Sequence, residues 1–188
     1  SAGTIFVKDT SVVGTHGNLV VDNGKPTLND WTQTYDWTVV TTPTGSTKIR
    51  SVGRHTITRI ELMDLANNLW RIEVDGANWK ATDLALDWGL QGIEVDLNAA
   101  DDLDETFVIV ENGLNHLIVR SEITLSGLEN NELVGVHRFD KLQVLNGASV
   151  DFGKDKVVVP AANFKLDEHS SLSVGEVDPS LLASMVSA

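Results

Sequence analysis

The sequence predicts an all-β protein whose chain winds as a parallel β-helix, or β-solenoid, with loop excursions. The phrase Ile-Glu-Val-Asp occupies residues 72–75 and returns unchanged at 93–96, twenty-one residues later. In the last third of the chain, apolar anchors recur every seven or eight residues, at Leu142, Val150, Val157, Phe164 and Leu172. Three such steps make a rung of about 22 residues, and a fixed period of about 20 to 50 residues is typical of repeat architectures. The two intervals agree, which favours stacked rungs.

Short β-branched runs bounded by Gly, Asn and Asp dominate the chain and predict strands. Helical periodicity is nearly absent; Pro179–Val186 follows Asp178, a suitable N-cap, and predicts a terminal cap over residues 178–188. The expected strands are, in order, Thr4–Lys8, Asn18–Asp22, Thr38–Thr41, Thr56–Leu62, Trp70–Val74, Gly92–Asp96, Thr106–Val110, His116–Ile123, Lys141–Leu145, Val150–Phe152, Lys156–Val159 and Leu172–Val174.

Asn-Gly turns follow three of these apolar runs, at residues 23–24, 112–113 and 146–147. Both residue types tolerate positive φ, so the dipeptide suits a sharp solenoid corner and equally a β-hairpin. An antiparallel β-sandwich therefore stays open as the alternative fold. Residues 31–45 break the spacing and predict a loop or β-excursion, the kind of segment on which binding residues concentrate.

Composition narrows the classes of partner. At 188 residues we expect one β-helix-like domain over 1–188, and an apolar segment that begins at Thr4 suggests a piece excised from a larger protein. The net charge of −13 repels phosphate backbones, so nucleic acid is not an expected partner. No run approaches the ~18 apolar residues of a membrane span, so no membrane insertion is expected. Without cysteine, disulfides and thiolate chemistry are excluded.

Both ends of the chain share a further pattern. Residues 3–8, Gly-Thr-Ile-Phe-Val-Lys, precede Gly-Asn-Leu-Val-Val-Asp-Asn-Gly at 17–24, and Phe-Asp-Lys-Leu-Gln-Val-Leu-Asn-Gly-Ala occupies 139–148. These segments resemble the right-handed β-helix regions of very large bacterial secreted or cell-surface proteins. The resemblance implies a right-handed β-helix in an adhesin-like or envelope-associated setting. Residues 31–138 depart from the pattern, so no function there follows from it.

An acidic column is expected if the two Ile-Glu-Val-Asp phrases stack. With the apolar residues facing inward, the acidic ones point outward on rungs about 4.8 Å apart, where like charges repel. A calcium ion would offset that repulsion with carboxylate and carbonyl ligands; the alternative is a solvated acidic face balanced by Arg71 or by screening. No other cofactor is expected. The candidate calcium ligands are Glu73, Asp75, Glu94 and Asp96, with Asp101, Asp102 and Asp104 of a neighbouring acidic turn.

Aromatic residues offer a second candidate site. Trp31, Tyr35 and Trp37 alternate with polar residues, so on a strand all three point to one side. Such a platform is either a core face or a surface on which sugar rings stack. The five histidines show no ligand spacing, and neither a nucleophile-elbow nor a phosphate-loop motif occurs.

Together these features predict a non-catalytic structural or adhesion module of a bacterial surface or secreted protein, with a glycan or a host or cell-surface protein as partner. One alternative is a carbohydrate-binding module that uses Trp31, Tyr35 and Trp37. The other is a polysaccharide-degrading β-helix enzyme that uses Asp75, Glu94 and Asp96 as acid and base.

Overall fold

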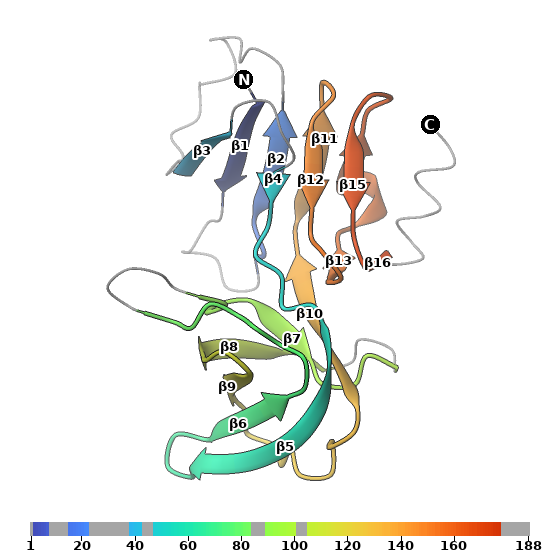
Figure 1. Ribbon diagram of the computed structural model, residues 1–188. Helices are drawn as coiled ribbons and strands as arrows, with labels where there is room; N and C mark the ends of the chain where they lie inside the picture. Colours follow the sequence, from blue (N-terminus) through green and yellow to red (C-terminus); the bar gives the residue numbers. More distant parts are fainter. Residues whose placement is uncertain are drawn as a thin grey trace. The chain divides into compact units, whose positions relative to one another are not determined.

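The computed structural model describes residues 2–7, 15–22, 38–42, 47–83, 89–100 and 105–177, with side chains outside the description at 2–7, 38–42 and 176–177. Within these ranges the protein is all-β, as predicted, with one 3-10 turn, η2 (Ala161–Asn163), and no α-helix. None of the described segments is a helix with the length and apolarity needed to cross a bilayer. The backbone divides into two compact units (Figure 1), which we call the barrel unit (Arg50–His137 with Lys154–Lys156) and the mixed-sheet unit (the rest).

The barrel unit contains a closed antiparallel β-barrel. Hydrogen bonds join its strands in the order β10-β5-β6-β9-β8-β7, and β7 pairs with β10 again, which closes the ring. The six strands are β5 (Arg54–Asp64), β6 (Leu69–Val74), β7 (Glu94–Asp96), β8 (Phe107–Asn112), β9 (His116–Arg120) and β10 (Glu132–Arg138).

Alternating side chains explain why these residues close into a barrel. In β6, Trp70, Ile72 and Val74 are buried while Arg71 and Glu73 face outward. The register of β5 shifts twice against β6 and that of β8 shifts once against β9, as β-bulges do. Bulges add bend and twist, which a closed sheet needs. The interior is packed with apolar side chains, namely Val52, Ile57, Trp70, Ile72, Val74, Trp79, Leu90, Val95, Leu97, Phe107, Ile109, Leu117, Val119, Leu125 and Leu133.

The mixed-sheet unit has two small sheets. A five-stranded sheet runs β14-β11-β2-β1-β3, antiparallel at β2-β1-β3 and parallel at β14-β11-β2; the second sheet, β15-β12-β4, is parallel. Its core includes Val21, Leu142, Val150 and Phe152. The strands outside the barrel are β1 (Ala2–Val7), β2 (Asn18–Asp22), β3 (Thr38–Thr42), β4 (Thr47–Lys48), β11 (Lys141–Leu145), β12 (Ser149–Asp151), β13 (Lys156–Val158), β14 (Phe164–Leu166), β15 (Ser171–Ser173) and β16 (Glu176–Val177).

The parallel pairs of this unit follow the interval expected for the last third of the chain. Leu142 lies opposite Phe164 and Val150 opposite Leu172, in each case 22 residues apart. Asn146 and Gly147 both have positive φ, 55° and 72°, and form the corner after β11. The parallel stacking is confined to these short sheets.

The predicted β-solenoid is therefore wrong, and so is the resemblance to right-handed β-helices of bacterial surface proteins. The repeated Ile-Glu-Val-Asp phrases contribute to β6 and β7, which are separated in the barrel by β9 and β8. Three antiparallel steps separate them, so the two strands run in opposite directions. The antiparallel sandwich is also wrong, because the six antiparallel strands of the barrel unit close on themselves. Each phrase predicts a strand, and neither specifies the strand beside it.

Two further predicted segments are reached only in part. Of residues 31–45, the structure describes 38–42, which form β3 and pair antiparallel with β1. The cap predicted over residues 178–188 lies outside the described residues.

Candidate functional site

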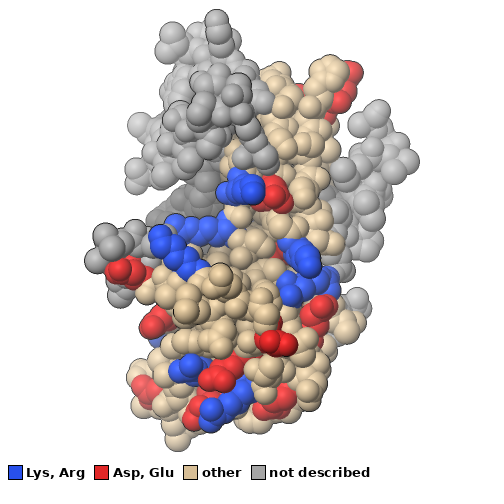
Figure 2. Space-filling view, in the orientation of Figure 1, with Lys and Arg blue, Asp and Glu red and all other residues tan. Residues whose placement is uncertain are grey.

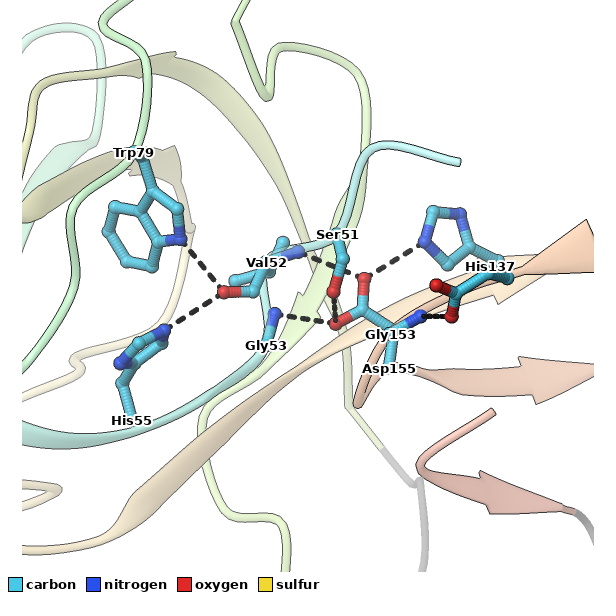
Figure 3. Close-up of polar contacts among 9 residues, drawn as sticks. Ser51, Val52, Gly53, His55, Trp79, His137, Gly153 and Asp155 are labelled. Carbon is cyan, nitrogen blue, oxygen red and sulfur yellow. Dashed lines mark hydrogen bonds and ion pairs between the residues drawn. The ribbon is translucent and has the colours of Figure 1, made fainter. Parts of the chain in front are cut away.

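Asp155 is the centre of the most connected polar group in the barrel unit. Its side chain is fully buried, and Figure 3 shows the loop at Ser51–Gly53 facing it. Oδ1 accepts hydrogen bonds from Ser51 Oγ at 2.9 Å and from the Gly53 N–H at 2.6 Å. Oδ2 accepts from the Val52 N–H at 2.9 Å and lies 2.9 Å from His137 Nε2. We call these five residues the Asp155 cluster.

Burial of this carboxylate depends on those four contacts. A carboxylate is costly to remove from water unless its oxygens are hydrogen-bonded, and bonds to an ionised acceptor are stronger than neutral ones. Because a carboxylate only accepts, His137 contributes an N–H from Nε2. Gly135 leaves room for the group: a Cβ at this position would lie 2.5 Å from the Asp155 carboxyl carbon.

The loop is held from its other side as well. The Val52 carbonyl accepts from Trp79 Nε1 at 2.8 Å and lies 3.1 Å from His55 Nε2 (Figure 3). The His55 and Trp79 rings meet edge to face with centroids 5.1 Å apart. His55 Nδ1 is in turn 3.1 Å from the Asp75 carbonyl oxygen. Both polar groups of the Val52 peptide are therefore paired, as buried backbone groups must be.

The composition of the Asp155 cluster suggests a catalytic triad, but its order does not. In a Ser-His-Asp triad the imidazole lies between the hydroxyl and the carboxylate, so that it can take the hydroxyl proton. Here the carboxylate lies in the middle, and Ser51 and His137 each bond to it separately. Ser51 Oγ donates to a fully coordinated acceptor and is not activated as a nucleophile. The arrangement fastens a loop to a barrel strand.

A buried ion pair lies elsewhere in the barrel unit. Lys156 Nζ is 3.2 Å from Asp96 Oδ2 and 3.5 Å from the Ala99 carbonyl oxygen. The side chains of Lys156 and Asp96 are 5% and 3% exposed. Asp96 also accepts the Asn98 N–H at 2.8 Å. A pair this buried fixes the position of its segments, because either charge alone would be strongly unfavourable there.

The outer face of β5, β6 and β9 carries charged side chains of both signs. Arg71 Nε lies 3.2 Å from Glu73 Oε1, and Arg59 lies 3.1 Å from Glu61. Arg71 also reaches His116 at 3.4 Å from Nδ1. Partial burial, followed by the nearby Arg71 charge, lowers the pKa of His116 below its ordinary value, while Glu73 and Glu111 oppose the shift.

The predicted acidic column is not assembled. Glu73 lies in β6 and Asp75 directly follows that strand. Glu94 and Asp96 lie in β7, and strands β9 and β8 separate β6 from β7. Glu73 pairs with Arg71, Glu94 accepts from Thr106 Oγ1, and Asp96 is buried against Lys156. Among the residues that the structure describes, no three His, Asp or Glu side chains are grouped closely enough to hold a metal ion. The β-helix on which the enzyme alternative depended is absent as well.

The remaining predicted site residues lie outside the described residues: Trp31, Tyr35 and Trp37 of the aromatic platform, and Asp101, Asp102 and Asp104 of the acidic turn. Of the other tryptophans, Trp70 and Trp79 are core residues at 8% and 9% exposure.

Sequence reasoning missed the Asp155 cluster. No motif in the sequence includes Asp155, Ser51 or His137. The separations along the chain, 104 residues to Ser51 and 18 to His137, leave no local signal. The pattern that could have drawn attention is weak: a carboxylate in a turn followed by the β-branched run of β13.

A shallow depression of about 300 Å³ in the mixed-sheet unit is lined by His16, Arg138, Phe139, Asp140, Val158, Val159 and Pro160. Asp140 Oδ2 is already used there, because it accepts the N–H groups of His16 at 3.0 Å and Gly17 at 2.8 Å. Asp140 therefore serves to hold the backbone at His16 and Gly17 beside the depression.

Comparison with known protein families, characterised proteins and solved structures gives no match for this chain. The geometry alone must carry the functional argument.

Proposed function

We propose that this chain is a non-catalytic structural and adhesion module, secreted or at a cell surface, whose partner is a glycan or a cell-surface protein. The observation that carries the proposal is the Asp155 cluster. Of the described residues, this is where serine, histidine and aspartate side chains converge. The two carboxylate oxygens are occupied by three donors of the Ser51–Gly53 loop and by His137 of β10. A site of this kind stabilises a fold and leaves no base for a reaction.

The packed interior of the barrel supports the same proposal. Small-molecule sites are concave and bury most of their ligand. Here Ile57, Ile72, Ile109 and Leu117 in the barrel core are each 0% exposed, so their packing fills the space that a ligand would need. Binding then falls to the exterior, where exposed apolar side chains such as Met63 and Leu65 are 52% and 76% accessible.

An attachment assay tests the proposal. Beads coated with the chain are washed over immobilised glycans and over fixed cells, with heat-unfolded chain on matched beads as the control. We expect retention that depends on the folded chain. Retention equal to that of the control would refute the adhesion role. Release of reducing sugar from acidic or neutral polysaccharides by the folded chain would refute the non-catalytic assignment.

A further inference from the structure

Strand β5 is longer than the neighbour on one of its sides. β10 lies opposite β5 only at Arg54–Thr56, and Ile57 adds backbone hydrogen bonds to Asn130 and Asn131. From Thr58 to Asp64, the pairing within the described residues is with β6 alone. Figure 1 shows β5 as the long strand that leads to the turn before β6. A strand paired on one side presents N–H and C=O groups of every second residue on the other, which is a template for another strand.

This segment, residues 58–64, is exposed and suited to pairing. It contains neither glycine nor proline, the residues that discourage strand addition. The Arg59 and Glu61 side chains are 60% and 48% exposed, and Leu62 and Met63 are 38% and 52% exposed. Three apolar residues, Ile60, Leu62 and Met63, stand among the charged residues of this segment. An added strand would therefore cover apolar surface as well as backbone.

The register with β6 assigns faces to these residues. Ile60 lies opposite Ile72 and Leu62 opposite Trp70, both core residues, so Ile60 and Leu62 face the core side. Arg59 lies opposite Glu73 and Glu61 opposite Arg71 on the outward side. Each β5 charge therefore has an opposite charge across the strand pair.

The positions of Arg59 and Glu61 make the segment complementary to itself. They flank Ile60 symmetrically, so an antiparallel copy centred on Ile60 places Arg59 of each chain opposite Glu61 of the other. Centring on Glu61 or Arg59 instead would set like charges directly opposite, which is destabilising. A shift by one residue would set the core-facing side chains against the outward ones. The register centred on Ile60 keeps the faces matched and is the one that sets Arg59 and Glu61 opposite each other.

We propose that two copies of this chain associate through β5, antiparallel, about a two-fold axis at Ile60. The outward face then carries the row Glu73, Arg59, Glu61, Arg71 across two β5-β6 pairs, alternating in sign at every step. Figure 2 shows acidic and basic side chains interspersed on the face of the barrel unit in view. An isologous contact of this kind closes at two copies and does not propagate. It does not depend on the proposed function, because an adhesin and an enzyme could both associate in this way.

The interface is short. Centred on Ile60, residues 58–62 of one copy lie opposite residues 62–58 of the other, because Thr56 and Ile57 are already paired on this side. Five residues a side lie at the small end of specific interfaces, below about 1,200 Å² in total, so the dimer should depend on concentration. Sedimentation velocity from about 10 µM to about 1 mM tests this, because that range spans the dissociation constants of weak dimers. We expect the weight-average mass to rise toward twice 20.4 kDa.

Charge reversal tests the register. In a dimer of Arg59→Glu, the introduced carboxylate of each copy lies opposite Glu61 of the other, so both cross-strand pairs are acidic. In a dimer of Glu61→Arg, both cross-strand pairs are basic. Each variant alone should dimerise at least about tenfold more weakly, since two cross-strand pairs change sign. An equimolar mixture restores both pairs in a heterodimer, so the mixture should associate as the unaltered chain does. Arg120→Glu and Glu122→Arg, which change exposed charges of the same unit, are the matched controls and should leave association unchanged.

These experiments have outcomes that would contradict the proposed dimer. A chain that is monomeric across the whole range overturns the proposal, as does a dimer that both reversals leave intact. A mixture that stays monomeric while each variant is folded by circular dichroism overturns the Ile60 register. Hydrogen exchange of the unaltered chain gives an answer that needs no variant. Residues 58–62 should exchange more slowly at high concentration, and unchanged exchange there with a dimer present would place the interface elsewhere.

Discussion

Replacing Asp155 by asparagine removes the buried charge of the Asp155 cluster with almost no change in volume. The amide keeps one acceptor oxygen and presents an NH2 group in place of the other. If the oxygen stays with Ser51 and Gly53, the NH2 group faces His137 and the Val52 N–H. The imidazole can change tautomer and accept, but the buried Val52 N–H, 2.9 Å from the lost oxygen, has no acceptor.

The magnitude follows from those losses. A hydrogen bond to a charged group contributes about 1.5 to 3 kcal/mol, and a buried donor without a partner costs about 1 to 3 kcal/mol. Together they predict that Asp155→Asn lowers the free energy of unfolding by about 2.5 to 6 kcal/mol, a large part of the ~5 to 15 kcal/mol typical of a domain.

Urea unfolding followed by tryptophan emission measures this difference. Trp79 donates to the Val52 carbonyl and so reports directly on the loop. Asp75→Asn, at an exposed carboxylate of the same unit, is the control and should change stability by less than about 0.5 kcal/mol. A loss below about 1 kcal/mol for Asp155→Asn would refute the reasoning that the carboxylate anchors the loop.

Three further predictions concern the barrel unit. Gly135→Ala should destabilise it by about 1 to 3 kcal/mol in urea, because the added methyl lies 2.5 Å from the Asp155 carboxyl carbon. Lys156→Met should cost about 3 to 5 kcal/mol by leaving Asp96 buried and unpaired, and adding Asp96→Leu should recover much of that loss. His116 has a pKa lowered by burial and by a neighbouring arginine, so below about pH 6.5 the unfolded chain binds the proton first. Its contribution to stability is therefore lost as pH falls through that value toward the folded pKa, and His116→Gln should flatten the decline measured between pH 7.5 and pH 5.5.

Each of these has an opposing outcome. Unchanged stability in Gly135→Ala would mean that the loop moves away at little cost. If the double variant Lys156→Met, Asp96→Leu is no more stable than Lys156→Met alone, the loss of stability comes from lost packing and not from the loss of the charge partner. An identical pH profile for His116→Gln would remove this histidine from the acid-dependent loss of stability.

Local features of the fold could be predicted from the sequence, because they depend on residues close together in the chain. The buried and exposed positions of β6 follow from simple alternation of Trp70 and Ile72 with Arg71 and Glu73. Positive φ at Asn146 and Gly147 follows from the tolerance of these residue types for that conformation.

The candidate site could not be predicted in the same way. A buried carboxylate needs donors, and three of the four donors of Asp155 come from Ser51, Val52 and Gly53, more than 100 residues away in the chain. Two of those donors are backbone N–H groups, which every residue except proline possesses. The residue types at positions 52 and 53 therefore carry no information about the hydrogen bonds to Asp155.

An all-β chain, the turn at Asn146 and Gly147, and the 22-residue interval at which β11 meets β14 could be predicted from the sequence alone, because each depends on residue types and local spacing. Which strands lie beside one another could not be predicted in this way. Two identical tetrapeptides became β6 and β7, two strands apart and opposite in direction, because alternation specifies which face of a strand is buried but not the strand beside it. Pairing is decided by how the whole set of buried faces closes around one core, and that is a property of the assembled chain.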